Sequence, residues 1–211
     1  MAALSAFWGS TRHSTKRYSA TRTMQKGISS LGYALLGLVH GKPSSGYDLR
    51  KIFSSTSMKT YSDSPGAIYP ALRRLERQDL IRGTIEKGSG LRHRQIFRLT
   101  PAGVAALKTW ITRPVVAEDL THGYEQIVLR FAFSETVAGP AASLELLESL
   151  HAALKRHIQA LHQEFDASHQ LMPRSGRLAF ECGVRDSESL LEWTEYAIAC
   201  YLKQVRKKGS D

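Results

Sequence analysis

The chain has 211 residues, of which 42% are apolar and 23% are charged, and its formal net charge is +10. This length allows one domain with a hydrophobic core plus an extension. The sequence contains no apolar stretch long enough to cross a membrane, and two cysteines are too few for a disulfide framework. The strong positive charge favours an acidic partner, with nucleic acid preferred over a membrane surface.

The positive charge is concentrated in the first half of the chain. Residues 1–27 carry five Lys and Arg and no acidic residue, and residues 28–112 carry thirteen against five Asp and Glu. Residues 113–211 are weakly acidic, with eleven Lys and Arg against fourteen Asp and Glu. We therefore expect a DNA-binding domain at 28–112 and a helical domain at 113–211. Residues 1–27 are interpreted as a basic flexible arm or a mis-called start, with Met24 as an alternative initiator, in preference to a targeting segment.

Apolar residues recur at helical spacing in two short segments that open the predicted DNA-binding domain. The first contains Leu31, Leu35 and Leu38 and is ended by the Gly41-Lys42-Pro43 stop. The second runs from Tyr47 to Phe53, and a polar turn follows it. Two short helices of this kind precede the recognition helix of a helix-turn-helix domain.

Residues 64–81 carry the most informative pattern in the sequence. Ser64 and Pro65 suit a helix start, and one face of the helix is apolar: Ile68, Ala71, Leu72 and Leu75. The opposite face carries Tyr69, Arg73, Arg74 and Arg77, and we expect these residues, together with Ser64, to contact DNA. Because Pro70 removes a backbone hydrogen bond, we expect the regular helix to begin near Gly66 or Ala67. An anchored helix with Arg and Tyr outward suits the DNA major groove, and the alternative is a surface helix with solvated charges.

A basic β-hairpin is predicted immediately downstream. Segments 82–86 and 93–99 have strand composition and flank a glycine-rich tip. Three basic residues lie at or beside this tip, and we expect them to follow the DNA backbone or enter the minor groove: Lys87, Arg92 and Arg94. Thr100-Pro101 then caps a further helix. The first half of the chain therefore predicts a winged helix-turn-helix.

These motifs together resemble the PadR family of transcriptional regulators. The resemblance rests on residues 68–76, on Ser45-Gly46-Tyr47-Asp48-Leu49 and on Arg98-Leu99-Thr100-Pro101, with Tyr69-Pro70 as the most specific element. It implies repression of transcription, often until a phenolic acid or another aromatic or lipophilic compound releases the repressor. We expect a homodimer on a palindromic operator, because a helix-turn-helix protein reaches two half-sites through a twofold partner. Such an effector could contact an aromatic set between the domains: Trp110, Tyr124, Phe131 and Trp193. The alternative interpretation of these aromatic residues is core packing.

The second half of the chain is predicted to be helical. Apolar residues recur every seven positions between Pro140 and Met172, and a final helix is expected from Leu178 to Lys207. We expect six residues of these helices to bury against a partner chain: Leu147, Leu154, Ile158, Leu161, Trp193 and Ile198. An internal helical hairpin that buries the same residues is the alternative. The predicted fold class is mostly α (α+β), a winged helix-turn-helix followed by long C-terminal helices that form a dimerisation domain.

Catalytic and metal-binding motifs are missing from the sequence. It has no phosphate loop, no GxGxxG, GxSxG or HExxH, and its histidines at 151, 157, 162 and 169 lack the spacing of a metal site. We expect a cytoplasmic DNA-binding protein that is not an enzyme and needs no cofactor or metal. A non-specific nucleic-acid-binding protein or a purely scaffolding dimer is the alternative function.

Overall fold

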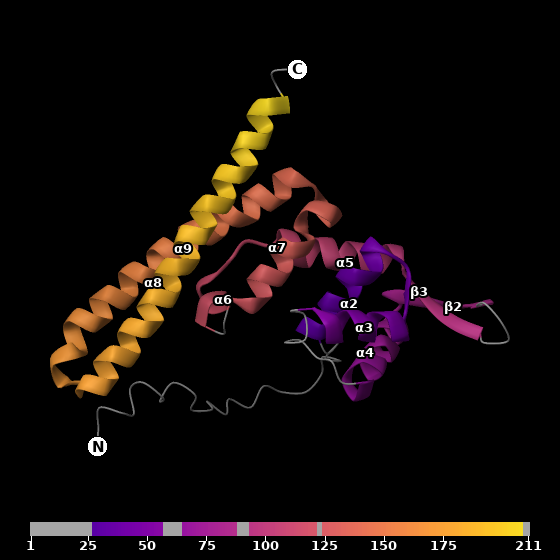
Figure 1. The fold of residues 1–211 in the computed structure, drawn as a ribbon, viewed down its shortest axis with the longest axis horizontal. Coiled ribbons are helices and arrows are strands. Elements are labelled where there is room, and N and C mark those ends of the chain that lie inside the picture. The colour runs from indigo at the N-terminus through magenta and orange to yellow at the C-terminus, as the bar shows by residue number, and fades with distance from the viewer. Residues whose placement is uncertain (1–26, 57–64, 88–92, 122–123, 209–211) are drawn as a thin grey trace, which may run out of the picture.

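The computed structural model describes residues 27–56, 65–87, 93–121 and 124–208. Figure 1 shows a small winged-helix head and a long antiparallel helix pair that extends away from it. This arrangement confirms the predicted fold class, a mostly helical chain with one small sheet. Within the described part of the chain, none of the helices combines the length and the apolar character that crossing a bilayer requires.

The head contains the helices and the β-hairpin predicted for a winged helix, and one short strand, β1, that was not predicted. In chain order they are α2 (Ser30–Gly41), β1 (Ser44–Ser45), α3 (Gly46–Ser55), α4 (Pro65–Arg77), β2 (Ile81–Lys87), β3 (His93–Leu99) and α5 (Pro101–Thr112). The strands form an antiparallel sheet of order β1-β3-β2, in which Ile81 pairs with Leu99 and Ser45 with Ile96. Thr100 caps α5 as expected, because its hydroxyl accepts a hydrogen bond from the Gly103 N–H at 3.0 Å.

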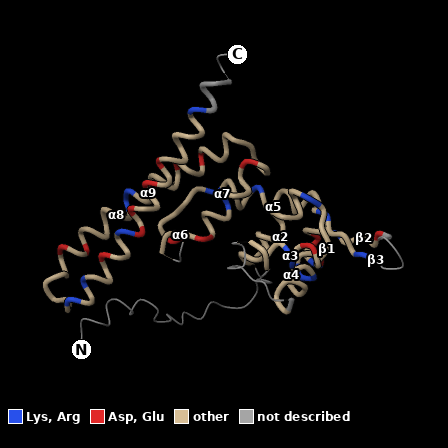
Figure 2. The backbone as a smooth tube through the Cα atoms, in the orientation of Figure 1, with Lys and Arg blue, Asp and Glu red and all other residues tan. Residues whose placement is uncertain are grey.

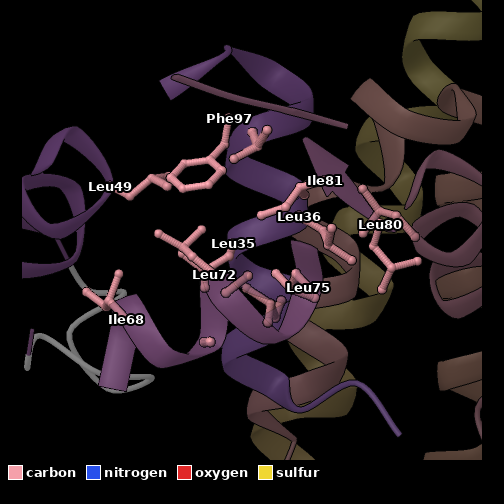
Figure 3. Close-up of a cluster of buried hydrophobic side chains, with 14 of the residues drawn as sticks. Leu35, Leu36, Leu49, Ile68, Leu72, Leu75, Leu80, Ile81 and Phe97 are labelled. Carbon is pink, nitrogen blue, oxygen red and sulfur yellow. The ribbon is translucent and has the colours of Figure 1, made fainter. Parts of the chain in front are cut away.

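The core of the head lies where α2, α3, α4 and the sheet meet (Figure 3). Five of its side chains are at most 1% exposed: Leu35 and Leu36 of α2, Leu49 of α3, and Ile68 and Leu72 of α4. Burying one such side chain stabilises the folded state by about 1.5–3 kcal/mol. This cluster fixes the orientation of α4 on the head, with its polar face outward.

The described residues of the C-terminal half form four helices and one short 3-10 turn. They are α6 (Ala117–Thr121), α7 (Glu125–Ala138), α8 (Pro140–Ser168), the turn His169–Leu171 and α9 (Arg174–Lys208). Helices α8 and α9 lie side by side along much of their length (Figure 1). Helix α9 begins at Arg174 and not near Leu178 as predicted, because residues 174–177 already form its first turn. Helix α6 was not predicted at all.

The packing corrects part of the predicted dimer surface. Leu147 and Leu154 are at most 1% exposed and pack against other elements of the same chain. Their side chains are therefore covered within the chain and offer no surface to a partner. The other four predicted interface residues are only partly covered: Ile158, Leu161, Trp193 and Ile198. At Leu147 and Leu154, the heptad spacing therefore serves packing within the chain, as the internal helical hairpin predicts, and not a dimer surface.

Helix α7 joins the head to the C-terminal helices. Its Leu129 belongs to the head core, whereas its Ile127 belongs to a second apolar cluster with α8 and α9. The ring of Phe133 fills the place of a side chain at Gly37, where a Cβ would lie 2.4 Å from the ring. Only glycine at this position lets α2 and α7 approach so closely. The division into domains at residues 112 and 113 therefore remains a proposal, because α7 contributes to both cores.

A buried arginine, which the sequence analysis missed, lies at this junction. Arg130 of α7 is fully buried and donates hydrogen bonds to the carbonyl oxygens of Ile111, at 3.0 Å, and of Arg113. Its Nη1 lies 3.9 Å from a carboxylate oxygen of Asp119. The same carboxylate forms an ion pair with Nη2 of Arg113 at 2.6 Å. Burial, together with the like charge of Arg113, lowers the pKa of Arg130 to about 10. Arg130 thus ties the end of α5 to α6 and α7.

Candidate nucleic-acid interface

Helix α4 presents the two faces that its sequence pattern predicts. Ile68, Ala71, Leu72 and Leu75 are at most 3% exposed. The predicted DNA-contacting side chains on the opposite face are all exposed: Tyr69, Arg73, Arg74 and Arg77. The buried face fixes the helix, and the outward donors are free to meet phosphate and base edges.

The α4 helix begins at Pro65 and continues through Pro70, slightly earlier than expected. Pro65 occupies the first turn, where a missing N–H costs nothing. Pro70 does cost one backbone hydrogen bond, but its neighbours Ile68 and Ala71 are held by core packing. Tertiary packing therefore outweighs the local cost of proline here.

Tyr69 is positioned by close contact with the start of α3. A Cβ at Gly46 would lie 2.6 Å from Cε1 of the Tyr69 ring, so a larger residue at 46 would displace the ring. A groove of about 500 Å³ lies beside this contact, lined by residues of α3, α4 and β3 that include Tyr47, Tyr69 and Arg94. The groove joins the recognition helix to the base of the wing on one surface.

Helix α3 adds exposed residues that the sequence analysis did not single out. Tyr47 is 55% exposed, and the Arg50 guanidinium lies 5.7 Å from the centre of its ring. Both face away from the buried Leu49 and Phe53. A helical wheel drawn on residues 46–55 would have identified them in the same way as it identified the outer face of α4.

The start of α3 is fixed by a capping box. The Ser45 hydroxyl accepts from the Asp48 N–H at 3.2 Å and donates to the Asp48 carboxylate at 2.7 Å. The hydrogen bond from the Ser45 hydroxyl keeps the pKa of Asp48 below its usual value, although partial burial acts in the opposite direction. This box orders the backbone that carries Tyr47 and contacts Tyr69.

Part of the predicted wing lies within the described residues. Arg94 is exposed on β3, and Arg98 bridges the hairpin to Glu86 at 2.8 Å and to the Thr84 hydroxyl at 3.0 Å. Glu76 of α4 accepts from the Gly83 N–H at 3.0 Å, which fixes the recognition helix relative to β2. Ser64, Arg92 and the side chain of Lys87 lie outside the described residues.

The exposed arginines on α4 have different local contacts. Nε of Arg77 donates to the Arg73 carbonyl at 3.3 Å, one turn back along the helix. Arg73 itself makes no side-chain hydrogen bond or ion pair with the described residues. Figure 2 shows Lys and Arg on α3, α4 and the hairpin beside a few acidic residues, and residues of both signs along α8 and α9. The head therefore offers a polyanion its positive charge on the same elements that expose Tyr69 and Arg73.

A family model matches the same region. Residues 35–109 fit the model described as the transcriptional regulator PadR-like family. The winged-helix head is PadR-like. The match confirms the resemblance inferred from the motifs, and it spans the capping box, the Tyr69-Pro70 pair and the hairpin. No curated protein matches the sequence.

Several solved structures are similar to this chain at low identity. Bacillus subtilis PadR in complex with operator DNA is 20% identical, covers 83% of this chain and 99% of its own, and gives a TM-score of 0.40. The same protein in complex with p-coumaric acid is 20% identical over 82% of this chain and 99% of its own, with a TM-score of 0.37. A PadR-like transcriptional regulator from Bacillus cereus is 18% identical. The match covers 87% of this chain and 99% of its own, with a TM-score of 0.36.

The four aromatic residues considered for an effector do not meet in one place. Trp110 stacks on Tyr33 of α2 with ring centroids 4.1 Å apart and belongs to the head core. Phe131 and Trp193 meet edge to face at 5.4 Å in the second cluster, and Tyr124 is 45% exposed. The predicted set therefore needs correction, because Trp110 points into the head and away from the other three.

Proposed function

We propose that this PadR-like chain is a sequence-specific DNA-binding regulator that acts as a homodimer on a palindromic operator. The observation that carries the proposal is α4, whose apolar face is locked in the head core while Tyr69 and Arg73 face solvent. A helix held in this way can enter the major groove, where bidentate contacts from Arg identify guanine. The family model supports the same class of function.

We assign a different part of the interface to each exposed basic element. Arg73 is the candidate base reader, and Arg74 and Arg77 are placed beside it to contact phosphate. Arg94, with Lys87 and Arg92 on the wing, is expected to follow the backbone or reach the minor groove. Tyr47 and Arg50 of α3 extend this surface across the groove beside Tyr69.

The dimer is assigned to the outer faces of α8 and α9. Tyr196, Leu178 and Leu202 of α9 are large apolar residues with 70%, 56% and 45% exposure. Together with the partly covered Ile158 and Ile198, they give the helix pair apolar surface that its own chain leaves uncovered. A twofold partner on these helices would present two α4 helices to two half-sites.

The sign of regulation follows from the family resemblance. We propose repression that a small aromatic or lipophilic compound relieves, with Tyr124, Phe131 and Trp193 as the remaining candidates for contact. The alternative is a non-specific nucleic-acid-binding protein or a scaffold that dimerises through α8 and α9. The positive charge of the head supports both the regulator and the non-specific binder, so only specificity distinguishes them.

Selection from a random DNA pool by the intact chain tests the proposal. We expect enrichment of an inverted repeat whose half-site centres are about 34–36 Å apart, one turn of B-DNA. A pool that is retained without any shared sequence would instead indicate non-specific binding. A chain that retains no DNA at moderate salt would indicate the scaffold.

A further inference from the structure

A cavity of about 400 Å³ lies between α6, α8 and α9, outside the DNA-binding face. Apolar side chains form most of its wall: Leu120, Leu154, Leu161, Ala179, Phe180 and Leu190. Among the four aromatic residues predicted for an effector, only Tyr124 lines it. Its volume is within the range of cavities that hold small organic molecules.

The charged groups of the cavity are unbalanced. Asp186 of α9 and His157 of α8 line it, and neither Lys nor Arg does among the described residues. Two other acidic residues of α9 have partners on α8, since Glu195 contacts His151 at 3.0 Å and Glu188 contacts His162 at 3.4 Å. Asp186 makes no ion pair within the described ranges. The mostly apolar cavity thus carries one exposed carboxylate that no cationic side chain of the described residues neutralises.

We propose that this cavity binds a small amphipathic cation, an aromatic ring system that carries a protonated amine. The apolar wall would take the rings out of water, and the Asp186 carboxylate would accept the ammonium group. The same carboxylate disfavours an aromatic acid, because the two negative charges would repel each other. The proposal rests on the cavity itself and does not depend on the proposed operator.

Gly183 offers a way to fill the cavity without disturbing the packed core. It lies on α9 at the cavity wall, and a Cβ built there would meet no atom within 4 Å. Gly183→Leu therefore extends a side chain into open space. Because Leu favours the helical backbone more than Gly does, the variant should fold at least as well as the wild type.

Isothermal titration calorimetry of the intact chain, without DNA, tests the proposal. The probes share one ring system and differ in charge: the cation 1-naphthylmethylamine, the neutral 1-naphthalenemethanol and the carboxylate 1-naphthaleneacetate. We expect the amine to bind about fivefold more tightly than the alcohol, the gain that an exposed ion pair provides, and the acetate to bind more weakly still. Asp186→Asn should make the amine and the alcohol equal, and Gly183→Leu should remove binding of all three. Asp166→Asn, an exposed acid elsewhere on α8, is the matched control and should behave as wild type.

Three results would overturn the proposal. One is equal affinity for the three probes in the wild type, and another is a preference for the amine that persists in Asp186→Asn. The third is a wild type that binds none of the probes. If Gly183→Leu then also lowers the particle mass in light scattering, a second copy of the chain covers the cavity. None of these results depends on whether the chain recognises an operator.

Discussion

Arg130 illustrates how a single residue can be hidden from sequence analysis. It sits in a helical segment whose apolar residues include Ile127, Leu129 and Phe131, and a long charged side chain there is normally exposed. In the structure it is fully buried, and its Nε and Nη1 atoms have no hydrogen-bond partner among the described residues. No local signal reveals this, because its acceptors are main-chain oxygens at the end of α5. Only the approach of α7 to that helix end creates the site.

Replacing Arg130 should destabilise the junction between the head and the C-terminal helices, by an amount that depends on the replacing side chain. Arg130→Ala leaves a cavity and removes the donor to two carbonyl groups, so we expect a loss of about 3 kcal/mol in the free energy of unfolding. Arg130→Met refills the volume without the hydrogen bonds and should recover roughly half of that loss. Unfolding in guanidinium chloride measures the loss for both variants. Arg156→Ala on the exposed face of α8 should change stability by less than about 0.5 kcal/mol. Equal losses for Met and Ala would show that volume contributes nothing.

Asp48 makes the stability of α3 dependent on pH. Its pKa is lower in the folded chain than its usual value, because it accepts hydrogen bonds from Ser45. The folded state therefore gains stability above pH 4, near the ordinary value, and loses it as the pH falls through the lower folded value. Asp48→Ala should cost about 1 kcal/mol at pH 7 and progressively less below pH 4, as measured by urea unfolding. A constant difference down to pH 2.5 would contradict the charged capping box.

At the scale of elements, α4 and the hairpin were the most predictable part of the chain. The apolar stripe of α4, the turn residues and the paired strand segments each agree with the tertiary structure, so local and global preferences coincide. Pro70 was a local conflict, and the core packing of Ile68 and Ala71 resolved it. The heptads of α8 were less informative. An internal hairpin and a dimer need the same spacing, and the structure buries Leu147 and Leu154 within the chain.

Arg73 is expected to set specificity from the exposed face of α4. Arg73→Ala should weaken binding to the selected operator by about 1–3 kcal/mol and relax selectivity at one base position. Fluorescence anisotropy with the operator and a set of single-base variants measures this change. Lys155→Ala on α8 serves as a charge-matched control and should leave the affinity unaltered. If Arg73→Ala weakens operator and scrambled DNA by the same factor, Arg73 contacts phosphate and does not read a base.

At the scale of the whole molecule, the dimer makes one prediction that needs no DNA. Light scattering at micromolar concentration should give twice the 23.5 kDa mass of the chain. Tyr196→Asp adds a charge to an exposed apolar site on α9 and should shift the mass toward a single chain without loss of helix content. Val116→Asp, at an exposed apolar site outside α8 and α9, should leave the mass unchanged. A wild type of 23.5 kDa would assign the heptads to an internal hairpin alone.

Recognition of an operator is the central claim, and the affinity ratio between specific and scrambled DNA tests it most directly. The DNA upstream of the chain's own gene supplies the specific probe, and a shuffled fragment of the same length and composition supplies the reference at the same salt concentration. We predict that the intact chain binds the specific fragment at least about 10³-fold more tightly, as operator-binding proteins do. Equal affinity for the native fragment, the shuffled fragment and the repeat selected from the random pool would contradict the claim.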